Sequence, residues 1–437
     1  MSLPSPWDVP PAGPLRGELA VNGDKSVSHR ALLVGAVCDG PVRVRGFGAS
    51  ADTLATLGAV RALGVPVDEL RDGELVVHGR GLRGLAAPDD VIDVQNAGTL
   101  LRLLPGLLAG QPRGRYTLDG DASIRRRPVE RVAAPLREMG AEVESTDGRP
   151  PLHVRAGAAL RGIEYRLPVA SAQVKSCVLL AGLYGDGPTT VVEPTPTRDH
   201  TERLLVAAGA QIDRRAGRAT IHPPTSLSLG SLEVPGDFSS AAPFVVAATL
   251  LPESLLLIRN VGVNPGRTGL LTVLERMGGR VGLVNRRVTA GGEPVADLEV
   301  RHAELVATEV EPELVPAMVD ELPLLALAAS AARGRTTVRG AEELAVKESN
   351  RLETTRDALF ACGAHLDATD DGWRIRGVPA RLRGGTVHPH GDHRIAMLGA
   401  VAGLWSENGV RVLDPASIEV SFPGFRDLVA ALLEGPA

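Results

Sequence analysis

The most regular feature of this sequence is a short polar segment followed by a run of small apolar residues. Six such segments occur, and they begin at Gly23, Asn96, Ser171, Asp237, Asp320 and Asp392. The runs are rich in Ala, Leu, Val and Gly, which is typical of buried helices, and Asp, Asn and Ser are favoured where a helix begins. The sequence therefore predicts six buried helices with polar first turns.

A strand pattern follows each of these predicted helices. β-Branched or aromatic residues come after a small-residue turn, as at Val42–Val44, Tyr116–Leu118, Thr190–Val192, Leu256–Ile258, Thr337–Val338 and Val410–Val412. An amphipathic helix comes next, and the pattern recurs about every 65 to 85 residues, which suits a βαβ-type unit with additional strands. Because 437 residues exceed what one core usually serves, we predict an α/β fold of two domains with three units each.

The amino-acid composition and net charge limit the kinds of molecule that the chain is expected to bind. A net charge of −5 argues against nucleic acid or an anionic membrane, so an anionic ligand must be met by a local cluster of cations. The three cysteines (Cys38, Cys177 and Cys362) are widely spaced, which fits a reducing cytosol and neither a zinc site nor a disulfide. The longest apolar stretch, 241–258, is interrupted by prolines and a glutamate, so we expect no membrane span. The segment Met1–Pro14 is rich in proline and has no basic region leading an apolar core, so we expect no export signal.

Cations stand at several of the predicted helix starts. Lys25 and Arg30 lie in the first turns of one helix, where free backbone N–H groups and the helix dipole favour an anion. Arg127 precedes Pro128, which we expect to be the first residue of a helix over Val129–Met139. Single residues of this kind are more often caps or solvated side chains. The whole set, Lys25, Arg127, Lys347, Arg351 and Arg394, is too large for one carboxylate and suits one or two phosphate groups.

Lysine is rare in this chain. Only Lys25, Lys175 and Lys347 occur among 47 basic residues, and two of them fall in the densest polar motifs. A lysine kept in an arginine-rich background indicates a place where a compact ammonium cannot be replaced by a planar guanidinium. The alternative is that three lysines remain by chance.

Two carboxylates complete the candidate chemistry in the second half. Asp320 precedes a predicted helix, where the dipole would keep it ionised and where capping is its ordinary role. Glu348 lies between Lys347 and Arg351, whose i,i+4 spacing predicts that both cations share one helix face. A surface ion-pair helix is the alternative reading of that segment.

The motifs together are those of a known family. They are GDKSVSHR, NAGT with Arg102, RRRP, ASAQVKS, TRDHTE, MVDELP, VKESNR and GDHRIAM, in order from about Leu15 to Leu433. In these residues the chain resembles the 5-enolpyruvylshikimate-3-phosphate synthases. The resemblance implies transfer of the enolpyruvyl group of phosphoenolpyruvate to the 5-hydroxyl of shikimate 3-phosphate, with release of phosphate, in aromatic amino-acid biosynthesis. It implies no metal and no organic cofactor, and we expect a cytoplasmic monomer.

The resemblance also implies a fold. Two similar domains would each contain three βαβαββ units, with helix N-termini facing an interdomain cleft. Residues 1–22 and 237–437 would form a discontinuous C-terminal-type domain, and residues 23–236 the inserted domain. The chain would then cross between the domains twice.

Site residues follow from the same resemblance. Shikimate 3-phosphate would be bound by Lys25, Ser26, Arg30, Ser171, Ala172, Gln173, Arg198, Asp320 and Lys347. Phosphoenolpyruvate would be bound by Lys25, Gly98, Arg127, Gln173, Arg351 and Arg394. Asp320 would take the hydroxyl proton, Glu348 would protonate the methylene carbon, and Lys25 would assist. Positive character at the central carbon and proton transfers on different atoms need such an acid and base in a cationic site.

Three positions depart from the best-known branch of that family. Val420 stands where many members carry a lysine, and Glu343 and Ala172 stand where many have Asn and Ser. We interpret these as marks of the family's second class. Glyphosate, which occupies the phosphoenolpyruvate site in this family, is expected to inhibit, because position 98 is Gly and tolerant relatives carry Ala.

Two other functions are compatible with parts of the pattern. The related enolpyruvyl transferase acting on UDP-N-acetylglucosamine uses a cysteine in the loop corresponding to Asp121–Ile124, and none is present here. A non-catalytic anion-binding protein would keep the cations but has no need of Asp320 and Glu348. A phosphate-release assay with each acceptor separates the three.

Overall fold

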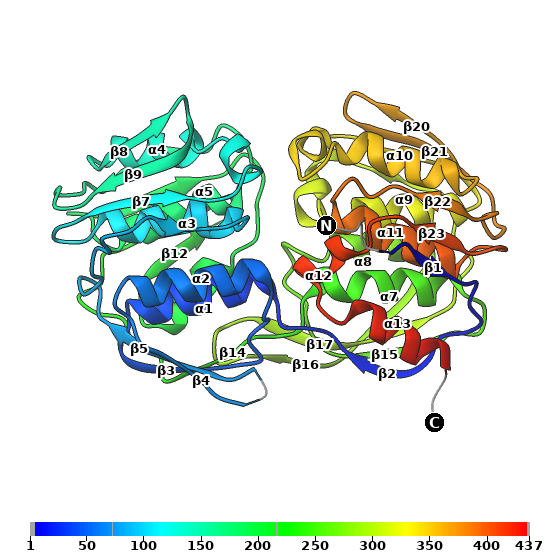
Figure 1. Ribbon diagram of the computed structural model, residues 1–437, viewed down its shortest axis with the longest axis horizontal. Helices are drawn as coiled ribbons and strands as arrows, with labels where there is room; N and C mark the ends of the chain where they lie inside the picture. The colour runs from blue at the N-terminus through cyan, green and yellow to red at the C-terminus, as the bar shows by residue number, and fades with distance from the viewer. Residues whose placement is uncertain (1–4, 72, 216, 435–437) are drawn as a thin grey trace. The chain divides into compact units, whose positions relative to one another are not determined.

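The structure is a computed structural model that describes residues 5–71, 73–215 and 217–434. Its described residues form two compact units, whose elements can be followed in Figure 1. The inserted unit comprises Gly23–Pro235 and Val288–Pro294. The terminal unit comprises the described residues of Met1–Asn22, Gly236–Arg287 and Val295–Ala437.

The segment Val288–Pro294 differs from the sequence analysis, which left it in the C-terminal-type domain and expected only two crossings. It is the tip of a hairpin, and it belongs to the inserted unit. Glu293 contacts His200 Nδ1 through its Oε1 at 2.8 Å, and the Gly292 carbonyl accepts a hydrogen bond from Arg203. These contacts are long-range in sequence, so no local pattern could predict them.

The inserted unit contains three four-stranded sheets among its described residues. Their strand orders are β14(Ser231–Glu233)-β3(Asp39–Arg45)-β5(Leu75–Arg80)-β4(Val67–Glu69), β6(Ile92–Asp93)-β7(Arg115–Asp119)-β9(Arg149–Arg155)-β8(Glu142–Thr146) and β10(Glu164–Arg166)-β11(Thr189–Val192)-β13(Arg218–Ile221)-β12(Ile212–Arg215). Its helices are α1(Lys25–Ala36), α2(Ala51–Ala62), α3(Gly98–Ala109), the short η1(Ile124–Arg126), α4(Glu130–Glu138), α5(Ala172–Gly182) and α6(His200–Ala207).

The terminal unit repeats this plan. Its sheets are β16(Arg280–Val288)-β17(Pro294–Arg301)-β15(Leu255–Gly262)-β2(Arg16–Ala20), β18(Glu309–Val310)-β19(Gly334–Val338)-β21(Gly372–Gly377)-β20(His365–Thr369) and the three-stranded β1(Trp7–Val9)-β23(Val410–Val412)-β22(Gly385–Val387). Its helices are α7(Phe238–Leu250), α8(Gly269–Arg276), η2(Pro312–Ala317), α9(Leu322–Ala331), η3(Glu342–Val346), α10(Arg351–Ala361), α11(His393–Leu404), α12(Ala416–Ser421) and α13(Phe425–Glu434).

Each of the six sheets has one parallel pair of strands, joined to an antiparallel neighbour. The parallel pairs are β14–β3, β6–β7, β10–β11, β15–β2, β18–β19 and β22–β23. A parallel pair needs a crossover, and one buried helix supplies it in four pairs: α3 in β6–β7, α5 in β10–β11, α9 in β18–β19 and α11 in β22–β23. The predicted βαβαββ unit is therefore confirmed, with β2 and β14 completing sheets whose other strands lie far along the chain.

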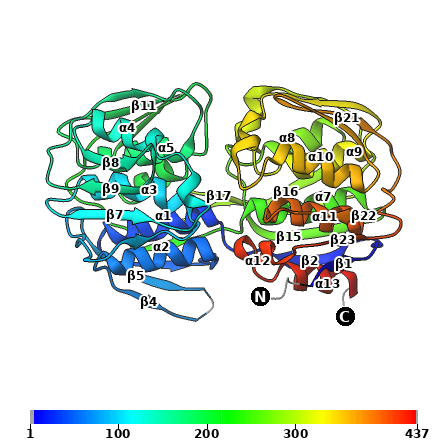
Figure 2. The same ribbon diagram turned by 45° about the horizontal axis from the view of Figure 1, so that its top comes forward.

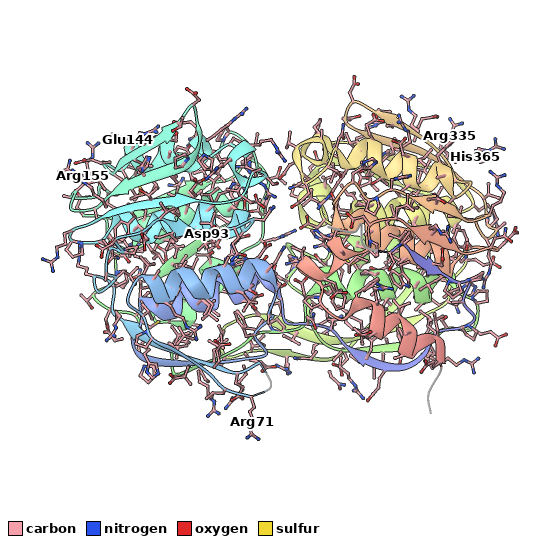
Figure 3. All side chains as sticks on the ribbon, in the orientation of Figure 1. Arg71, Asp93, Glu144, Arg155, Arg335 and His365 are labelled. Carbon is pink, nitrogen blue, oxygen red and sulfur yellow. The ribbon has the colours of Figure 1, made fainter. Side chains whose placement is uncertain are left out.

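Alternation along the strands fixes which face of each sheet is covered. In β20, Leu366 is buried whereas His365 and Asp367 are exposed, as expected for a strand with one face on the core. Figure 3 shows His365 and Arg335 directed outward from this sheet, and Arg155 and Glu144 directed outward from the β7–β9–β8 sheet.

Three buried helices form the centre of each unit. They are α1, α3 and α5 in the inserted unit and α7, α9 and α11 in the terminal unit, and they can be traced in Figure 2. Nearly every residue of α3 and every residue of α7 is buried. Helices that are apolar all round belong inside a core, which explains the small residues in the six repeats. Side chains cap α1, α5, α7 and α11, at Asp24, Ser171, Asp237 and Asp392.

Candidate active site

The first two turns of α1 carry two of the predicted cations, Lys25 and Arg30. Asp24 accepts a hydrogen bond from the Val27 N–H at 2.8 Å and thereby fixes the helix start. The Lys25 ammonium forms a 2.9 Å ion pair with Asp52 at the beginning of α2, where both side chains remain partly accessible. Ser26 contributes its carbonyl to Arg30 one turn later. The start of α1 is thus fixed by a side-chain cap, and its lysine remains partly accessible.

Arg30 is the most tightly held of these residues. Its Nε donates to Thr201 Oγ1 at 2.7 Å, and its Nη2 donates to Ser176 Oγ at 2.9 Å. Burial lowers the pKa of Arg30 to about 10, with nearby carboxylates including Glu202 opposing the shift. The guanidinium is therefore charged at neutral pH and fixed by α5 and α6 as well as by its own helix.

A second group forms where α3 and α5 begin side by side. Arg102 donates to Gln173 Oε1 at 2.8 Å, and the Gln173 amide donates to Thr99 Oγ1 at 3.2 Å. Ser171 caps α5 by accepting from the Val174 N–H, so Gln173 lies in the first turn. This arrangement aims an amide and an arginine at the N-termini of both helices, where backbone N–H groups favour an anion.

Arg127 joins this group from the loop before α4. Pro128, expected to begin that helix, instead precedes the cap residue Val129, and α4 starts at Glu130. The Arg127 Nη2 donates to Asn96 Oδ1 at 2.7 Å, and the Asn96 amide donates to Asp121 at 2.7 Å. A chain from Asp121 through Asn96 therefore orients Arg127.

Gly98 lies directly beneath these guanidinium groups. A Cβ atom added there would lie 2.8 Å from Arg127 Nη1 and 3.2 Å from Arg102 Nη1. The absence of a side chain leaves room for the two arginines over the start of α3, and the first residues of that helix face them.

The remaining predicted residues of the inserted unit lie around α5. Ala172 is its first residue, and Arg198 stands two residues before α6, beside the cap residue Asp199. Lys175, one turn into α5, is 1% exposed and forms ion pairs with Glu193 at 2.9 Å and Glu202 at 2.8 Å. The inserted unit therefore contains Lys25, Ser26, Arg30, Gly98, Arg127, Ser171, Ala172, Gln173 and Arg198.

In the terminal unit, Arg351 is surrounded by carboxylates. Its Nε donates to Asp392 at 2.8 Å, its Nη2 to Glu348 at 2.7 Å, and its Nη1 approaches Asp320 at 3.4 Å. Burial disfavours the charged guanidinium, but Glu348, Asp392 and Asp320 outweigh it and raise the pKa of Arg351. The structure thus brings Asp320, Glu348 and Arg351 together at one point.

Asp392 connects Arg351 to the next predicted cation. Its carboxylate caps α11 by accepting from the Arg394 N–H, and it also accepts from Ser349. Burial raises the pKa of this carboxyl, but Arg351 outweighs burial and the pKa is lowered. Arg394 is nearly buried and donates to the Ser239 carbonyl at the start of α7.

The expectation that Lys347 and Arg351 share a helix face is wrong. The short helix η3 ends at Val346, Lys347 has extended backbone, and α10 begins only at Arg351. Asn350 breaks the helix because its side chain accepts from the Leu352 and Glu353 N–H groups and caps α10. The Lys347 ammonium instead pairs with Glu343 at 2.6 Å.

Val420, where the resemblance left a cation missing, lies on α12 and is 45% exposed. No helix in the described part of the chain is long and apolar enough to cross a membrane. Among the same residues, no group of three or more His, Cys, Asp or Glu side chains is arranged to hold a metal ion.

Sequence reasoning assigned no role to the residues that orient the site, although several of them stand in the quoted motifs. Asn96, Ser176, Thr201 and Asp392 each bond a predicted arginine, and Asp392 was visible only as a helix cap. Arg267 was also missed: it binds Asp237 and Ser239, and Ser239 donates to Glu321. Their partners lie far away in sequence, so residue type alone gave no signal.

These features define an α/β protein of two repeated units, in which polar side chains mark the starts of the buried helices and an arginine lies between the carboxylates of Asp320 and Glu348. We compared the chain with known protein families and with proteins of known function. The family model described as EPSP synthase (3-phosphoshikimate 1-carboxyvinyltransferase) matches residues 9–429. A 3-phosphoshikimate 1-carboxyvinyltransferase of Acidithiobacillus ferrooxidans is 49% identical over 95% of both chains, and one of Desulforudis audaxviator is 49% identical over 97% of this chain and 98% of the relative.

Solved structures give the same result. An EPSP synthase structure from Acinetobacter baumannii is 40% identical, covers 98% of both chains and superposes with a TM-score of 0.89. The chain belongs to the EPSP synthase family.

Proposed function

We propose that this chain is a 3-phosphoshikimate 1-carboxyvinyltransferase, which transfers the enolpyruvyl group of phosphoenolpyruvate to the 5-hydroxyl of shikimate 3-phosphate. The observation that carries the proposal is the cluster around Arg351. A buried guanidinium there stands between Asp320 and Glu348, so an anion-binding group adjoins two residues suited to proton transfer. Family membership supports the same reaction.

We assign phosphoenolpyruvate to arginines that lie close together in each unit. In the inserted unit Arg127, the start of α3 at Gly98, and Gln173 would bind it, assisted by Lys25; in the terminal unit Arg351 and Arg394 would do so. A carboxylate that binds Arg351 must compete with the protein's own acids. The 3.4 Å contact with Asp320 is the longest of the three, so it is the one that a substrate displaces at least cost.

Shikimate 3-phosphate is the ligand for the helix starts of α1 and α5. Lys25, Ser26, Arg30, Ser171, Ala172 and Arg198 would bind it with Gln173, together with Asp320 and Lys347 of the terminal unit. Charge-assisted hydrogen bonds from arginine to phosphate are strong and directional, which suits Arg30 because α5 and α6 already fix its guanidinium.

The chemistry is an addition followed by an elimination. Asp320 takes the proton of the 5-hydroxyl while that oxygen bonds to the central carbon of phosphoenolpyruvate, and Glu348 gives a proton to the methylene carbon. In the second step a proton returns from the new methyl group to Glu348, the bond from carbon to phosphate oxygen breaks, and the proton held by Asp320 passes to the departing phosphate, so that both carboxyl groups end as they began. Cations around the site stabilise the charge on the leaving phosphate.

A phosphate-release assay tests this function. With phosphoenolpyruvate present, shikimate 3-phosphate is expected to give steady release of phosphate, and UDP-N-acetylglucosamine is expected to give none. Phosphate release with UDP-N-acetylglucosamine but not with shikimate 3-phosphate would show that the chain catalyses the reaction of the related enolpyruvyl transferase. No release with either acceptor would favour a non-catalytic anion-binding protein.

We also propose that the enzyme acts as a monomer in the cytoplasm on these two small molecules. Light scattering of the purified chain tests the first part, because a mass near 45.7 kDa corresponds to one copy. A mass of twice that value would contradict it.

A further inference from the structure

Lys175 is a buried lysine that the proposed chemistry does not use. It lies one turn after the cap residue Ser171 on α5, and its side chain is 2% exposed. Its ammonium contacts Glu193 Oε2 at 2.9 Å, Glu202 Oε1 at 2.8 Å and the Thr197 carbonyl at 3.4 Å. These partners come from the end of β11, from α6 and from the segment between them.

The chemistry of this contact requires an ammonium. A buried charge is costly unless it is paired and hydrogen-bonded, and Lys175 has three acceptors for its three N–H bonds. A planar guanidinium directs its donors in one plane and could not meet acceptors on three different elements in the same way. Burial lowers the pKa of Lys175, but Glu202 and Glu193 outweigh burial and raise it, so the side chain stays charged.

The segment 193–202, which the Lys175 ammonium contacts, contains Arg198, a proposed ligand of shikimate 3-phosphate. Glu193 and Glu202 stand on either side of Arg198, and Thr197 next to it is tied twice. Its carbonyl accepts from Lys175, and its hydroxyl donates to Glu193. The backbone around Arg198 is therefore fastened to α5.

The residues around Lys175 also adjoin Arg30, the second proposed ligand of the phosphate group. Thr201, which precedes Glu202, bonds both Arg30 Nε at 2.7 Å and Ser176 Oγ at 2.7 Å. Ser176 follows Lys175 on α5 and also accepts from Arg30. A shift of α6 away from α5 would move Thr201 and release the Arg30 guanidinium.

We propose that Lys175 is a positioning residue for the phosphate of shikimate 3-phosphate: its ammonium fastens residues 193–202 to α5 and so places Arg198 and the partners of Arg30. The inference rests on the proposed function. Lys175 touches no substrate in this scheme, and its effect passes through the two arginines.

The test compares Lys175→Met with Thr197→Val by calorimetric titration of shikimate 3-phosphate and by steady-state kinetics. Loss of a positioning contact is expected to raise the dissociation constant and the KM for shikimate 3-phosphate by about 10- to 100-fold in Lys175→Met. Thr197→Val removes only the hydroxyl link without burying an unpaired charge, so a smaller rise is expected. In both variants kcat at saturation and the KM for phosphoenolpyruvate are expected to change less than about threefold.

Gln111→Met is the matched control. Gln111 is 1% exposed, lies just beyond the C-terminal end of α3, and donates to the Leu82 and Leu107 carbonyls. Its loss is expected to lower the melting temperature while leaving the binding of shikimate 3-phosphate unchanged, because α3 separates it from the helix starts.

Three outcomes are distinguishable. Weaker binding in both test variants but not in the control supports the inference. Wild-type affinity in a folded Lys175→Met or, if that variant does not fold, in Thr197→Val overturns it and leaves a purely structural salt bridge. A wild-type chain that binds no shikimate 3-phosphate would instead overturn the proposed function.

Discussion

At the scale of single residues, we propose that the size of residue 98 determines how well glyphosate binds relative to phosphoenolpyruvate. A methyl group there would press on Arg127 and Arg102, whose flexible ends can shift by a few tenths of an ångström. We predict competitive inhibition by glyphosate against phosphoenolpyruvate, with Gly98→Ala raising the inhibition constant more than the KM, because glyphosate is the longer molecule. One methyl in a filled site costs about 1 to 3 kcal/mol, or roughly 5- to 150-fold.

Gly58→Ala is the control for that prediction. Gly58 lies in the middle of α2 with nothing within 4 Å of an added Cβ, so alanine there should leave both constants unchanged. A wild type already resistant to glyphosate, or equal rises of both constants in Gly98→Ala, would show that residue 98 does not discriminate. Resistance of the wild type would direct attention to Val420, where the resemblance led us to expect a lysine.

The carboxylates beside Arg351 give a second residue-scale prediction. Asp320→Ala and Glu348→Gln are each expected to lower kcat by about 10²- to 10⁴-fold, the usual contribution of one general acid or base. Circular dichroism should show an unchanged fold, because both side chains are partly exposed. Glu353→Gln, an exposed change on α10, should keep normal turnover. Normal turnover in either test variant would remove that residue from the proposed chemistry.

His29 gives a prediction for pH. It is fully buried on α1 with Nδ1 2.6 Å from Thr56 Oγ1, and burial lowers its pKa from 6.5 to about 3, with Lys25 and Arg30 adding to the shift and Asp52 opposing it. Above pH 6.5 the ring is neutral in both states. Between 6.5 and 3 only the unfolded chain binds the proton, so His29 makes the free energy of unfolding fall as pH falls.

Chemical denaturation between about pH 6 and 4 measures this effect. The wild type is expected to lose up to about 1.4 kcal/mol more per pH unit than His29→Gln, which has no titrating group at this position. Parallel pH dependences for the two proteins would mean that His29 is protonated in the folded state.

At the scale of elements, the contact between α3 and α5 aligns the helix starts that carry Gly98 and Gln173. Gly106 permits it: a Cβ there would lie 2.3 Å from the Cys177 carbonyl oxygen and 3.2 Å from the Ala181 nitrogen, both backbone atoms of α5. Backbone cannot yield as a flexible side chain does, so Gly106→Ala must separate the helices.

We predict that Gly106→Ala lowers the free energy of unfolding by about 1 to 3 kcal/mol or more and weakens phosphoenolpyruvate binding through the Arg102–Gln173 hydrogen bond. Urea denaturation and the KM measure the two effects. Gly58→Ala serves as control, since alanine in an open helical site stabilises by about 0.5 to 1 kcal/mol. Equal stabilities of wild type and Gly106→Ala would contradict the close approach.

At the scale of the whole molecule, the residues proposed for one substrate are divided between two units. Arg30 belongs to the inserted unit, and Asp320 and Lys347 belong to the terminal unit. Under the proposed function one molecule of shikimate 3-phosphate binds all three residues, and it would then hold the two units together. We therefore predict that it lowers the radius of gyration in small-angle scattering and that phosphoenolpyruvate binds well only afterwards.

Shikimate, which lacks the phosphate, is the control ligand for that experiment, and it should have a weaker effect at equal concentration. A single radius for the free protein and for both complexes would count against ligand-driven closure. Tight binding of phosphoenolpyruvate to the free protein would count against the order of binding.

The sequence by itself determined the repeated units. Six buried helices and their strands were readable because hydrophobic periodicity and capping are local properties, and each predicted strand from Val42–Val44 to Val410–Val412 lies within an observed strand. The motifs were also sufficient to recognise the family.

Only the tertiary structure decided how the site is held. The helix break between Lys347 and Arg351 depends on Asn350 and on the contact of Ser349 with Asp392, more than forty residues away. Lys175 was noticed as a rare lysine, but its partners Glu193 and Glu202 became apparent only in the fold. Ion pairs and side-chain hydrogen bonds depend on distance in space, which a pattern with a short period along the chain does not encode.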